Sequence, residues 1–331
     1  MGKTKEVEKV EVQKNKKSPL NFIFSGKHSK TIQLTLMALP GALFFILFRY
    51  LPMAGLTIAF KDYLVTGGGF WKSLAASEWV GFDNFKFLFA TSDVLIAIRN
   101  TLCYNIVWIF LGLFISVAFA VMLHEITNKK LAKVYQTTMF FPYFLSWVIT
   151  ATFVFAFLSH ERGFLNSILE AFGHEDVKWY AEKKYWPFIL TFMHIWKITG
   201  YNCVIYLAAI CGIDNSLYEA AMIDGASRMQ RIRKITIPML KPMMVILTIM
   251  AIGRIFAADF GLFYNVPQAN MSGALKPVVD VVDTYIYNSM INLNDFGMST
   301  AAGLAQSAIG LIMIVGANFV VRKVDEDLSL F

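Results

Sequence analysis

Six long apolar runs alternate with polar segments along the chain, and this alternation predicts its architecture. Each run is close to or above the about 20 mostly apolar residues that cross the hydrocarbon core of a bilayer. We therefore expect an all-α integral membrane protein with six transmembrane helices, a membrane domain over residues 32–324, and short tails at 1–31 and 325–331. The predicted spans lie near 32–53, 97–126, 134–159, 186–211, 239–264 and 298–321.

The polar segment between the fourth and fifth runs, residues 214–242, carries the clearest local signals. Ser216 and Ser227 are each followed three residues later by a Glu or a Gln, which is the spacing of a capping box at a helix start. We therefore predict two short helices with a turn at Gly225 between them. In this interpretation the side chain of Glu219 caps the backbone N–H of Ser216.

Composition and charge agree with a membrane protein. Of the 331 residues, 56% are hydrophobic and 16% are charged, whereas about 25% are charged in a soluble domain. The net charge of +7 does not indicate a nucleic-acid partner, because the basic residues form short blocks beside the apolar runs. The polar segments on the side of both termini hold more than twice as many Lys and Arg residues as those opposite. The positive-inside rule therefore predicts that both termini and residues 214–242 are cytosolic.

Few residues suggest chemistry within this chain. Cys103, Cys203 and Cys211 lie in apolar runs without the spacing of metal ligands. Lys3 and Lys27 lie in fragments that resemble the end of a P-loop. No glycine-rich segment from a strand precedes Lys3, and Lys27 is followed by His28 where a Ser or Thr is needed. The histidines are dispersed, so they do not indicate a catalytic cluster in a membrane enzyme. We expect no catalytic residues, no metal site and no ATP site in this chain.

The segments predicted to lie outside the membrane are rich in aromatic residues. The first is expected to rest on the bilayer surface, where amphipathic rings prefer to lie. The second has helical spacing on one face, which suits either a lid helix or a docking surface for an external partner. In the third, residues 277–294, a helix is expected to start with Asp280 and Asp283 in its first turn. The aromatic positions are Trp71, Trp79, Phe82, Phe85, Phe87 and Phe89 in the first segment, and Phe164, Leu165, Ile168, Leu169 and Phe172 in the second.

The segment 214–242 resembles a known family motif. Glu219-Ala220-Ala221, three residues, Gly225, nine residues, Ile235, one residue and Ile237-Pro238 follow the pattern of the EAA loop in membrane subunits of binding-protein-dependent ABC importers. Residues 79–85, 99–102 and 318–325 are similar to the sugar permeases of that family, particularly those for oligosaccharides. The resemblance implies a type I permease fold with a cytosolic coupling helix between the fourth and fifth transmembrane helices.

The resemblance also implies a function and a set of partners. The chain would be the non-catalytic permease of an importer in the bacterial cytoplasmic membrane, moving a sugar by alternating access. Two separate ATPase subunits would bind ATP and Mg. The other expected partners are a second homologous permease, an extracytoplasmic solute-binding protein and membrane lipid. Glu219 would form an ion pair with a basic residue of the ATPase groove, in addition to the cap on Ser216 or in its place. The residues that would couple to the ATPase are Glu219, Ala220, Ala221, Asp224, Gly225, Arg228 and Pro238.

Seven polar residues fall within the last three predicted spans, where polar groups are costly and tend to mark a pathway or a pair. They could line one solute cavity, or Lys197 or Arg254 could instead pair with Asp259 or with another subunit. In the first case, two cations facing the cavity would favour an acidic glycan, since planar guanidinium matches carboxylate. The seven residues are His194, Lys197, Tyr201, Asn202, Arg254, Asp259 and Gln306.

A self-contained secondary transporter or channel for a polar solute could have the same number of spans. Such transporters commonly show inverted repeats and interrupted spans at matching positions of two halves. Neither feature is visible in this sequence, which favours the importer permease.

Overall fold

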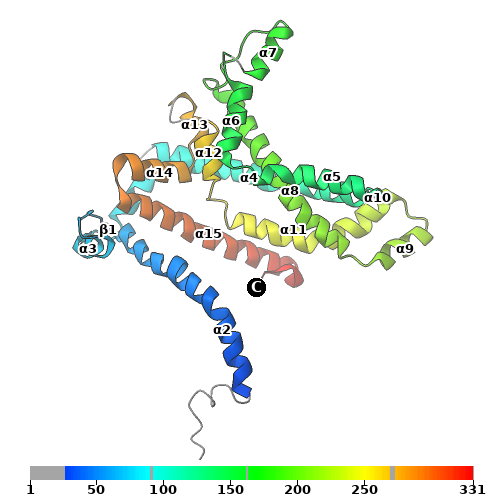
Figure 1. Ribbon diagram of the computed structural model, residues 1–331, viewed down its shortest axis with the longest axis horizontal. Helices are drawn as coiled ribbons and strands as arrows, with labels where there is room; N and C mark the ends of the chain where they lie inside the picture. The colour runs from blue at the N-terminus through cyan, green and yellow to red at the C-terminus, as the bar shows by residue number, and fades with distance from the viewer. Residues whose placement is uncertain (1–26, 90–91, 162, 269–272, 331) are drawn as a thin grey trace, which may run out of the picture. The chain divides into compact units, whose positions relative to one another are not determined.

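The computed structural model describes residues 27–89, 92–161, 163–268 and 273–330 (Figure 1). Contacts divide the chain into two units, one ending at Thr57 and one beginning at Ile58. In the first unit, α2 (Lys27–Phe45) continues through a π-helical turn into a 3-10 helix. The helical stretch Lys30–Phe60 is long and apolar enough to cross a membrane. Most of the tail expected at 1–31 lies outside the described residues.

The second unit is mostly helical, with one two-stranded antiparallel sheet among its described residues. Its elements are β1 (Lys61–Asp62), α3 (Phe70–Ala76), β2 (Glu78–Trp79), η3 (Asp83–Phe89), α4 (Ser92–His124), α5 (Lys129–Phe140), η4 (Phe141–Phe144), α6 (Trp147–Leu158), α7 (Phe164–Ala171), η5 (Lys183–Tyr185), α8 (Trp186–Cys211), α9 (Asn215–Ile223), α10 (Arg228–Arg231), η6 (Ile232–Thr236), α11 (Ile237–Ile252), α12 (Phe260–Asn265), η7 (Gly273–Leu275), α13 (Lys276–Val279), α14 (Val282–Leu293), α15 (Phe296–Val324) and η8 (Glu326–Leu328).

Four helices in the described residues are long and apolar enough to cross a membrane, and six if each of two bent pairs counts as one span. In one bent pair, α5 with η4 meets α6 at 99°. Pro142 lies in η4, and Ser146 caps α6 by accepting a hydrogen bond from the N–H of Ile149. Proline and a new N-cap both favour a helix boundary. The apolar run near 134–159 is therefore two helices.

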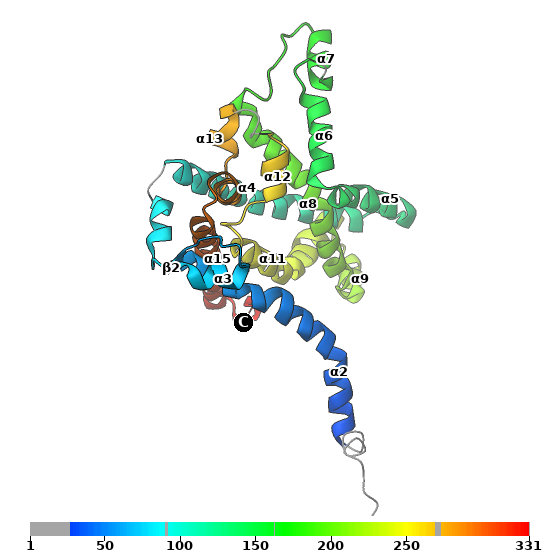
Figure 2. The same ribbon diagram turned by 60° about the vertical axis from the view of Figure 1, so that its left-hand side comes forward.

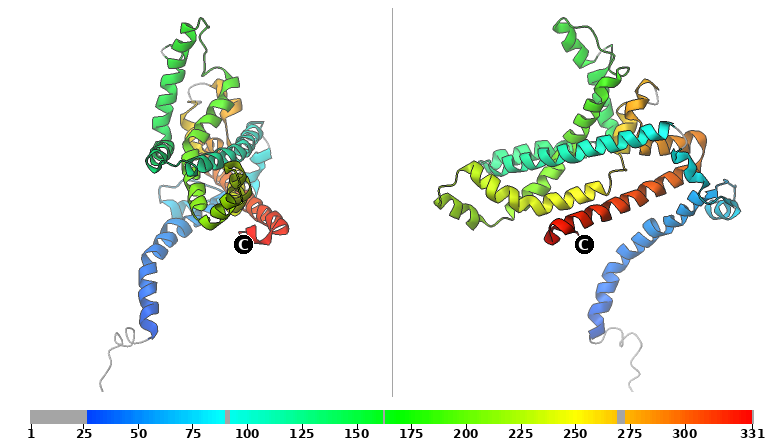
Figure 3. Two further views of the ribbon diagram at one scale, coloured as in Figure 1. Left: turned by 90° about the vertical axis from the view of Figure 1, so that its right-hand side faces the viewer. Right: turned by 180° about the vertical axis from the view of Figure 1, so that it is seen from behind.

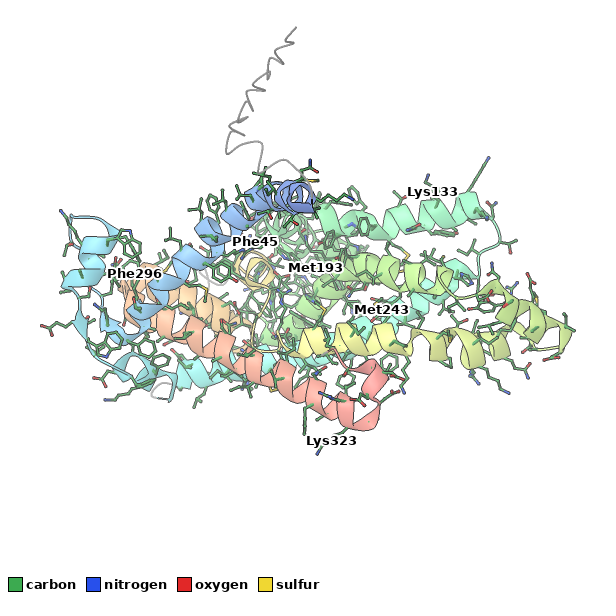
Figure 4. All side chains as sticks on the ribbon, turned by 90° about the horizontal axis from the view of Figure 1, so that it is seen from below. Phe45, Lys133, Met193, Met243, Phe296 and Lys323 are labelled. Atoms are coloured by element: carbon green, nitrogen blue, oxygen red, sulfur yellow. The ribbon has the colours of Figure 1, made fainter. Side chains whose placement is uncertain are left out.

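The long helices of the second unit enclose two clusters of buried side chains. The first surrounds Trp186 and Phe263 between α4, α6, α8 and α12, and the second surrounds Ile210 and Leu240 between α4, α8 and α11. Figure 2 shows α4, α8 and α11 converging. Figure 4 labels Met193 of the first cluster and Met243, which packs against the second. The helix α8 contributes to both clusters and thereby connects them.

A close helix approach explains one glycine of α8. A Cβ atom at Gly200 would collide with the backbone carbonyl of Met139 in α5. Only a residue without a side chain allows this separation, and small residues commonly permit such contacts between membrane helices. A larger residue at this position is therefore incompatible with the packing of α5 against α8.

Two polar residues near the start of α4 fix the segment around α13. The Asn100 side-chain N–H₂ group donates to the carbonyls of Pro277 and Asp280, at 3.2 and 2.8 Å. The Thr101 hydroxyl accepts from the N–H of Val282 at 3.0 Å. The helix expected to start with both aspartates in its first turn is shifted, because Asp280 ends α13 and only Asp283 lies in the first turn of α14.

The helix predicted from the aromatic spacing of the second outer segment is confirmed as α7. Leu165 packs against the first core cluster, whereas Phe164 and Phe172 are exposed. In the first outer segment, Trp79 stacks on Phe60 with ring centroids 5.7 Å apart and remains exposed. The side chains of 87–89 lie outside the described residues. In Figures 1 and 3, α9 and α10 lie at one end of the second unit and α3 and α14 at the other.

Candidate functional site

The segment 214–242, called the coupling loop below, begins with a different cap from the one predicted. The Asp214 side chain accepts a hydrogen bond from the N–H of Ser216 at 2.9 Å and is the N-cap of α9. The prediction that Glu219 caps Ser216 is therefore wrong, because this N–H is already bonded to a better-placed N-cap carboxylate. Hydrogen bonds from the backbone and side chain of Ser216 lower the pKa of Asp214 below its usual value. Glu219 is exposed.

The turn predicted at Gly225 is confirmed. Gly225 has φ = 78°, in the left-handed region that favours glycine. The N–H of Ala226 donates to the carbonyl of Ala221 at 2.8 Å, and the N–H of Gly225 donates to the carbonyl of Met222 at 3.1 Å. These two bonds form a Schellman motif that closes the C-terminus of α9. Gly225 therefore ends the first short helix, next to Asp224.

The second predicted capping box is also confirmed. The N–H of Ser227 donates to Gln230 Oε1 at 2.7 Å, and the N–H of Gln230 donates to Ser227 Oγ at 3.4 Å. From α10 the chain passes through the π-helical turn η6 into α11, where the N–H of Ile237 bonds to the carbonyl of Ile232. Pro238 lies in the first turn of α11, directly after this π-helical turn.

Side chains attach the coupling loop to the end of α4. The hydroxyls of Tyr218 and Thr236 lie 3.0 Å apart and join α9 to η6. Arg228 Nε lies 3.2 Å from Glu125 Oε2, just beyond the C-terminus of α4. Beneath them is a polar cavity of ≈ 340 Å³. Its lining residues are His124, Glu125, Ile126, Thr127, Asn215, Tyr218, Glu219, Met222, Arg228 and Arg231.

The helix α9 also exposes apolar side chains. Ile223 is 87% exposed, and Leu217 and Met222 are exposed as well, although Met222 also lines the polar cavity. Ala220 is exposed, and Ala221 is partly buried. A short helix that is attached to its own chain and still exposes apolar side chains is suited to fit into a groove of a second protein.

A second candidate site lies where the fifth apolar run is interrupted. The helix α11 ends at Ile252 and α12 begins at Phe260, so residues 253–259 are not helical. Arg254 therefore lies outside any helix, and the spacing between it and Asp259 is not a helical one. Unwound backbone at membrane depth must find hydrogen-bond partners within the protein.

Side chains from three other helices supply these partners. Asn105 of α4 donates to the carbonyls of Ile255 and Ala257, at 2.8 and 3.2 Å. Gln306 of α15 donates to the carbonyl of Phe256 at 2.6 Å. The carboxylate of α14 residue Asp283 accepts from the N–H of Ala258 at 2.7 Å and from Gln306 at 3.1 Å. The unwound segment is thus held in one conformation.

Lys197 and Asp259 each interact with residues at the junction between η4 and α6, where the third apolar run is bent. Asp259 Oδ2 accepts from Trp147 Nε1 at 2.9 Å, and Oδ1 accepts from the N–H of Leu262 at 3.3 Å. Lys197 Nζ lies 4.6 Å from the centre of the Trp147 ring and donates to the carbonyl of Leu145. Lys197 and Asp259 therefore join α6, α8 and α12 through Trp147 and Leu145, but they form no ion pair with each other among the described residues.

Four of the seven predicted pathway residues line one cavity of ≈ 610 Å³: His194, Asn202, Arg254 and Asp259. Its wall includes the ring of Trp108, on which His194 stacks with centroids 3.7 Å apart and planes 8° from parallel. Arg254 also lines a neighbouring cavity of ≈ 470 Å³, together with Gln306. Both cavities therefore open beside the unwound segment.

Tyr201 lies elsewhere. Its ring stacks on Tyr143 with centroids 4.7 Å apart, and neither cavity includes it or Lys197 among its lining residues. The structure thus brings five of the seven residues to two adjoining cavities. That a solute occupies these cavities stays a prediction.

Sequence reasoning missed several residues of this site. Asn105 is an amide within an apolar run, and the criterion that selected Asn202 would have found it. Trp108 and Trp147 gave no signal, because an aromatic residue in a membrane span has no distinctive spacing. Asp283 was treated as part of an external helix start, although it bonds to a residue of the last span.

Comparison with known proteins shows similarity over most of the chain. Residues 109–326 match the family described as binding-protein-dependent transport system inner membrane component. Protein LplB of Bacillus subtilis (strain 168) is 35% identical over 89% of this chain and 90% of its own length. The polygalacturonan/rhamnogalacturonan transport system permease protein YteP of the same organism is 33% identical over 89% of each.

Two solved structures of ABC transporters are also similar to this chain. A chain of a bacterial ABC transporter involved in the import of the acidic polysaccharide alginate superposes with a TM-score of 0.79 and is 31% identical, covering 89% of this chain and 97% of its own. The alginate ABC transporter in complex with an alginate pentasaccharide-bound periplasmic protein gives a TM-score of 0.78.

The fold and the coupling loop define an integral membrane permease of the type I ABC importer class, with a coupling helix between its fourth and fifth membrane segments. The match over residues 109–326 and the identity to LplB then place the chain more narrowly. It belongs to the family of inner membrane components of binding-protein-dependent transport systems.

Proposed function

We propose that this chain is the permease through which a binding-protein-dependent importer carries an acidic oligosaccharide into the cell. The observation that carries the proposal is Arg254. It stands in the unwound segment, lines both cavities, and belongs to none of the ion pairs among the described residues. Asp259 and Asp283 line the same cavities, but neither forms an ion pair with Arg254. A guanidinium without an ion pair and bordered by polar groups is suited to bind the carboxylate of a uronic acid.

The surroundings of Arg254 fit a sugar. Asn202 and Asn105 offer amides to hydroxyl groups, and Phe260 presents an aromatic ring in the same wall. Relatives point the same way, since YteP is named for polygalacturonan and rhamnogalacturonan and the similar solved structure is that of an alginate importer. All three named polysaccharides carry carboxylates.

The coupling loop supports the mechanism. In the proposal both termini and the loop are cytosolic, and the exposed face of α9 fits into a groove of an ATPase subunit that binds ATP and Mg. Two ATPases, a second permease and an external solute-binding protein complete the importer. When the ATPases close, each coupling helix moves, and α10, η6 and α11 transmit that movement to the unwound segment around Arg254.

The test uses Arg254→Met in the complete importer, with uptake of an oligogalacturonate and of its methyl ester as readouts. We expect R254M to slow uptake of the acid form about tenfold, since a charge-assisted hydrogen bond contributes about 1.5–3 kcal/mol. Uptake of the neutral ester should change much less. Arg254→Lys should retain part of the activity on the acid form.

The matched control is Lys197→Met. Because Lys197 is bonded to Leu145 and Trp147 instead of lining a cavity, its loss should affect both substrates equally through lower stability. Equal loss of both substrates in R254M would contradict the acidic-substrate proposal while leaving the importer function intact.

A further inference from the structure

A groove on the outside of α4 and α8 is separate from both candidate sites. It has a volume of ≈ 650 Å³ and an almost wholly apolar lining. Along α4, five of the lining residues follow a row with a spacing of four, and Asn100 and Tyr104 lie beside the row at its start. The lining residues are Arg99, Asn100, Cys103, Tyr104, Val107, Leu111 and Ile115 on α4, Pro187, Phe188, Thr191, Phe192 and Ile195 on α8, and Val278 of α13.

The length and direction of the groove suit a lipid in one leaflet of a bilayer. A helical rise of 1.5 Å per residue places Ile115 about 24 Å from Arg99 along α4. A hydrocarbon core of about 30 Å gives each leaflet roughly 15 Å, so the groove is long enough for an acyl chain and the region of its headgroup. Pro187 lies at the start of α8 as Arg99 lies near the start of α4.

The charge is confined to one end of the groove. Arg99 is exposed there, and its Nε and Nη2 groups donate to Asn100 Oδ1 and, from Nη2, to the carbonyl of Pro277 at 2.9 Å. A guanidinium has five N–H donors, and no described residue accepts from Nη1. Lys276, the residue before Pro277, is exposed near the same end.

Acidic residues near this end do not neutralise Arg99. No described carboxylate forms an ion pair with Arg99. The backbone carbonyl of Asp280 accepts a hydrogen bond from Asn100. Burial raises the pKa of its carboxyl group, although Lys276 acts in the opposite direction.

We propose that this groove binds one membrane phospholipid, with its phosphate at Arg99 and one acyl chain along Val107 and Leu111. The bonds to Asn100 and Pro277 hold the guanidinium in place and leave its Nη1 group for the phosphate. On α4 the lining from Val107 to Ile115 is apolar, which suits an acyl chain better than a sugar. The site is a fixed lipid site on the permease, distinct from general solvation by the bilayer.

The experiment is native mass spectrometry of the complete importer complex, delipidated and then titrated with defined lipids. Phosphatidylglycerol and phosphatidylethanolamine should each bind one copy per permease chain, whereas a diacylglycerol with the same acyl chains should not compete. Arg99→Gln keeps a donor for Pro277 but removes the charge, so it should weaken binding about tenfold. Val107→Trp should fill the groove and abolish binding.

Two matched controls separate the groove from the surrounding surface. Phe110→Trp changes an exposed residue of α4 outside the groove, and Lys72→Gln removes an exposed cation elsewhere. Both should bind phospholipid as the unchanged complex does. Equal occupancy in all four variants, or equal binding of diacylglycerol, would overturn the proposal. So would a complex that binds no lipid here because a second permease covers the groove.

The comparison of phosphatidylglycerol with diacylglycerol needs no substitution, so it decides the proposal even if a variant fails to assemble. Uptake of the transported solute is not the readout. A failure of the lipid proposal is therefore distinguishable from a failure of the proposed substrate.

Discussion

A single N-cap shows how finely residue choice determines the coupling loop. Asp214 and Ser216 are both favourable N-cap residues, and the sequence places them two positions apart. The structure selects Asp214, whose carboxylate accepts from the N–H of Ser216. Glu219 is therefore released from a capping role and stays exposed on α9, available for contact with a partner.

The cap makes the start of α9 sensitive to pH. The pKa of Asp214 is lowered by its hydrogen bonds with Ser216, so the carboxylate form stabilises the folded helix. This stabilisation is fully present above the unfolded pKa of about 3.9 and is lost as the pH falls through the lower folded pKa. Asp214→Asn should keep a cap without this pH dependence, and Asp214→Ala should lack the cap at every pH.

Amide hydrogen exchange of the α9 first turn in the purified complex measures this effect. At pH 7, D214A should exchange several-fold faster than the unchanged chain, and D214N only slightly faster. The exchange rate of D214A divided by that of the unchanged chain should approach one as Asp214 becomes protonated. The exchange rate of D214A divided by that of D214N should stay above one at every pH. A pH-independent ratio for D214A would show that the cap does not depend on the charge of Asp214.

At the scale of helices, the sequence predicts where helices occur better than where they are interrupted. All six apolar runs contain helix, and the two short helices of the coupling loop lie where predicted. The interruption at 253–259 could not be read from hydropathy, because Ile255, Phe256 and Ala257 keep the window apolar. What stabilises the unwound backbone is a set of side chains on α4, α14 and α15, which are distant in sequence.

The same reason limits prediction of the candidate site. The seven polar residues were correctly recognised as unusual for membrane spans, but their partners depend on tertiary contacts. Lys197 donates to the backbone carbonyl of Leu145, which is free to accept because η4 ends at Phe144. Tyr201 shares α8 with His194 but faces Tyr143 on another side. Spacing along a predicted helix was insufficient without the crossing geometry of its neighbours.

We expect the two hydrogen bonds of Asn105 to contribute most to holding the unwound segment 253–259. Asn105→Leu would leave the carbonyls of Ile255 and Ala257 without their donor, and each unsatisfied buried group costs about 1–3 kcal/mol. We expect a lower thermal unfolding midpoint in detergent and slower transport. The control is Asn202→Leu, since Asn202 lines the same cavity but no bond among the described residues depends on it. An equal loss of stability in N105L and N202L would argue against this role for Asn105.

At the scale of the whole molecule, the two candidate sites are connected by continuous structure. The coupling loop is attached to the end of α4 through Arg228 and Glu125, and α4 also carries Asn105, which holds the unwound segment. The coupling loop continues directly into α11, whose last residue precedes that segment. A movement applied at α9 therefore has two routes to Arg254, through α4 and through α11.

The exposed face of α9 is where such a movement must enter, and this gives the last prediction. Ile223→Glu places a charge on a side chain that is 87% exposed, so the isolated permease should fold with an unchanged unfolding midpoint. In contact with an ATPase groove, the buried charge lacks a partner and weakens association by several kcal/mol. We expect the ATPase to copurify poorly and transport to fail.

Val324→Glu is the matched control, because Val324 is 81% exposed at the end of α15, outside the coupling loop. It should assemble and transport normally. Copurification in mild detergent, compared with the unfolding midpoint of each permease variant, separates lost assembly from lost folding. If I223E copurified with the ATPase as V324E does, the apolar face of α9 would not be the contact, and force would have to enter through the exposed polar residues of the loop such as Glu219.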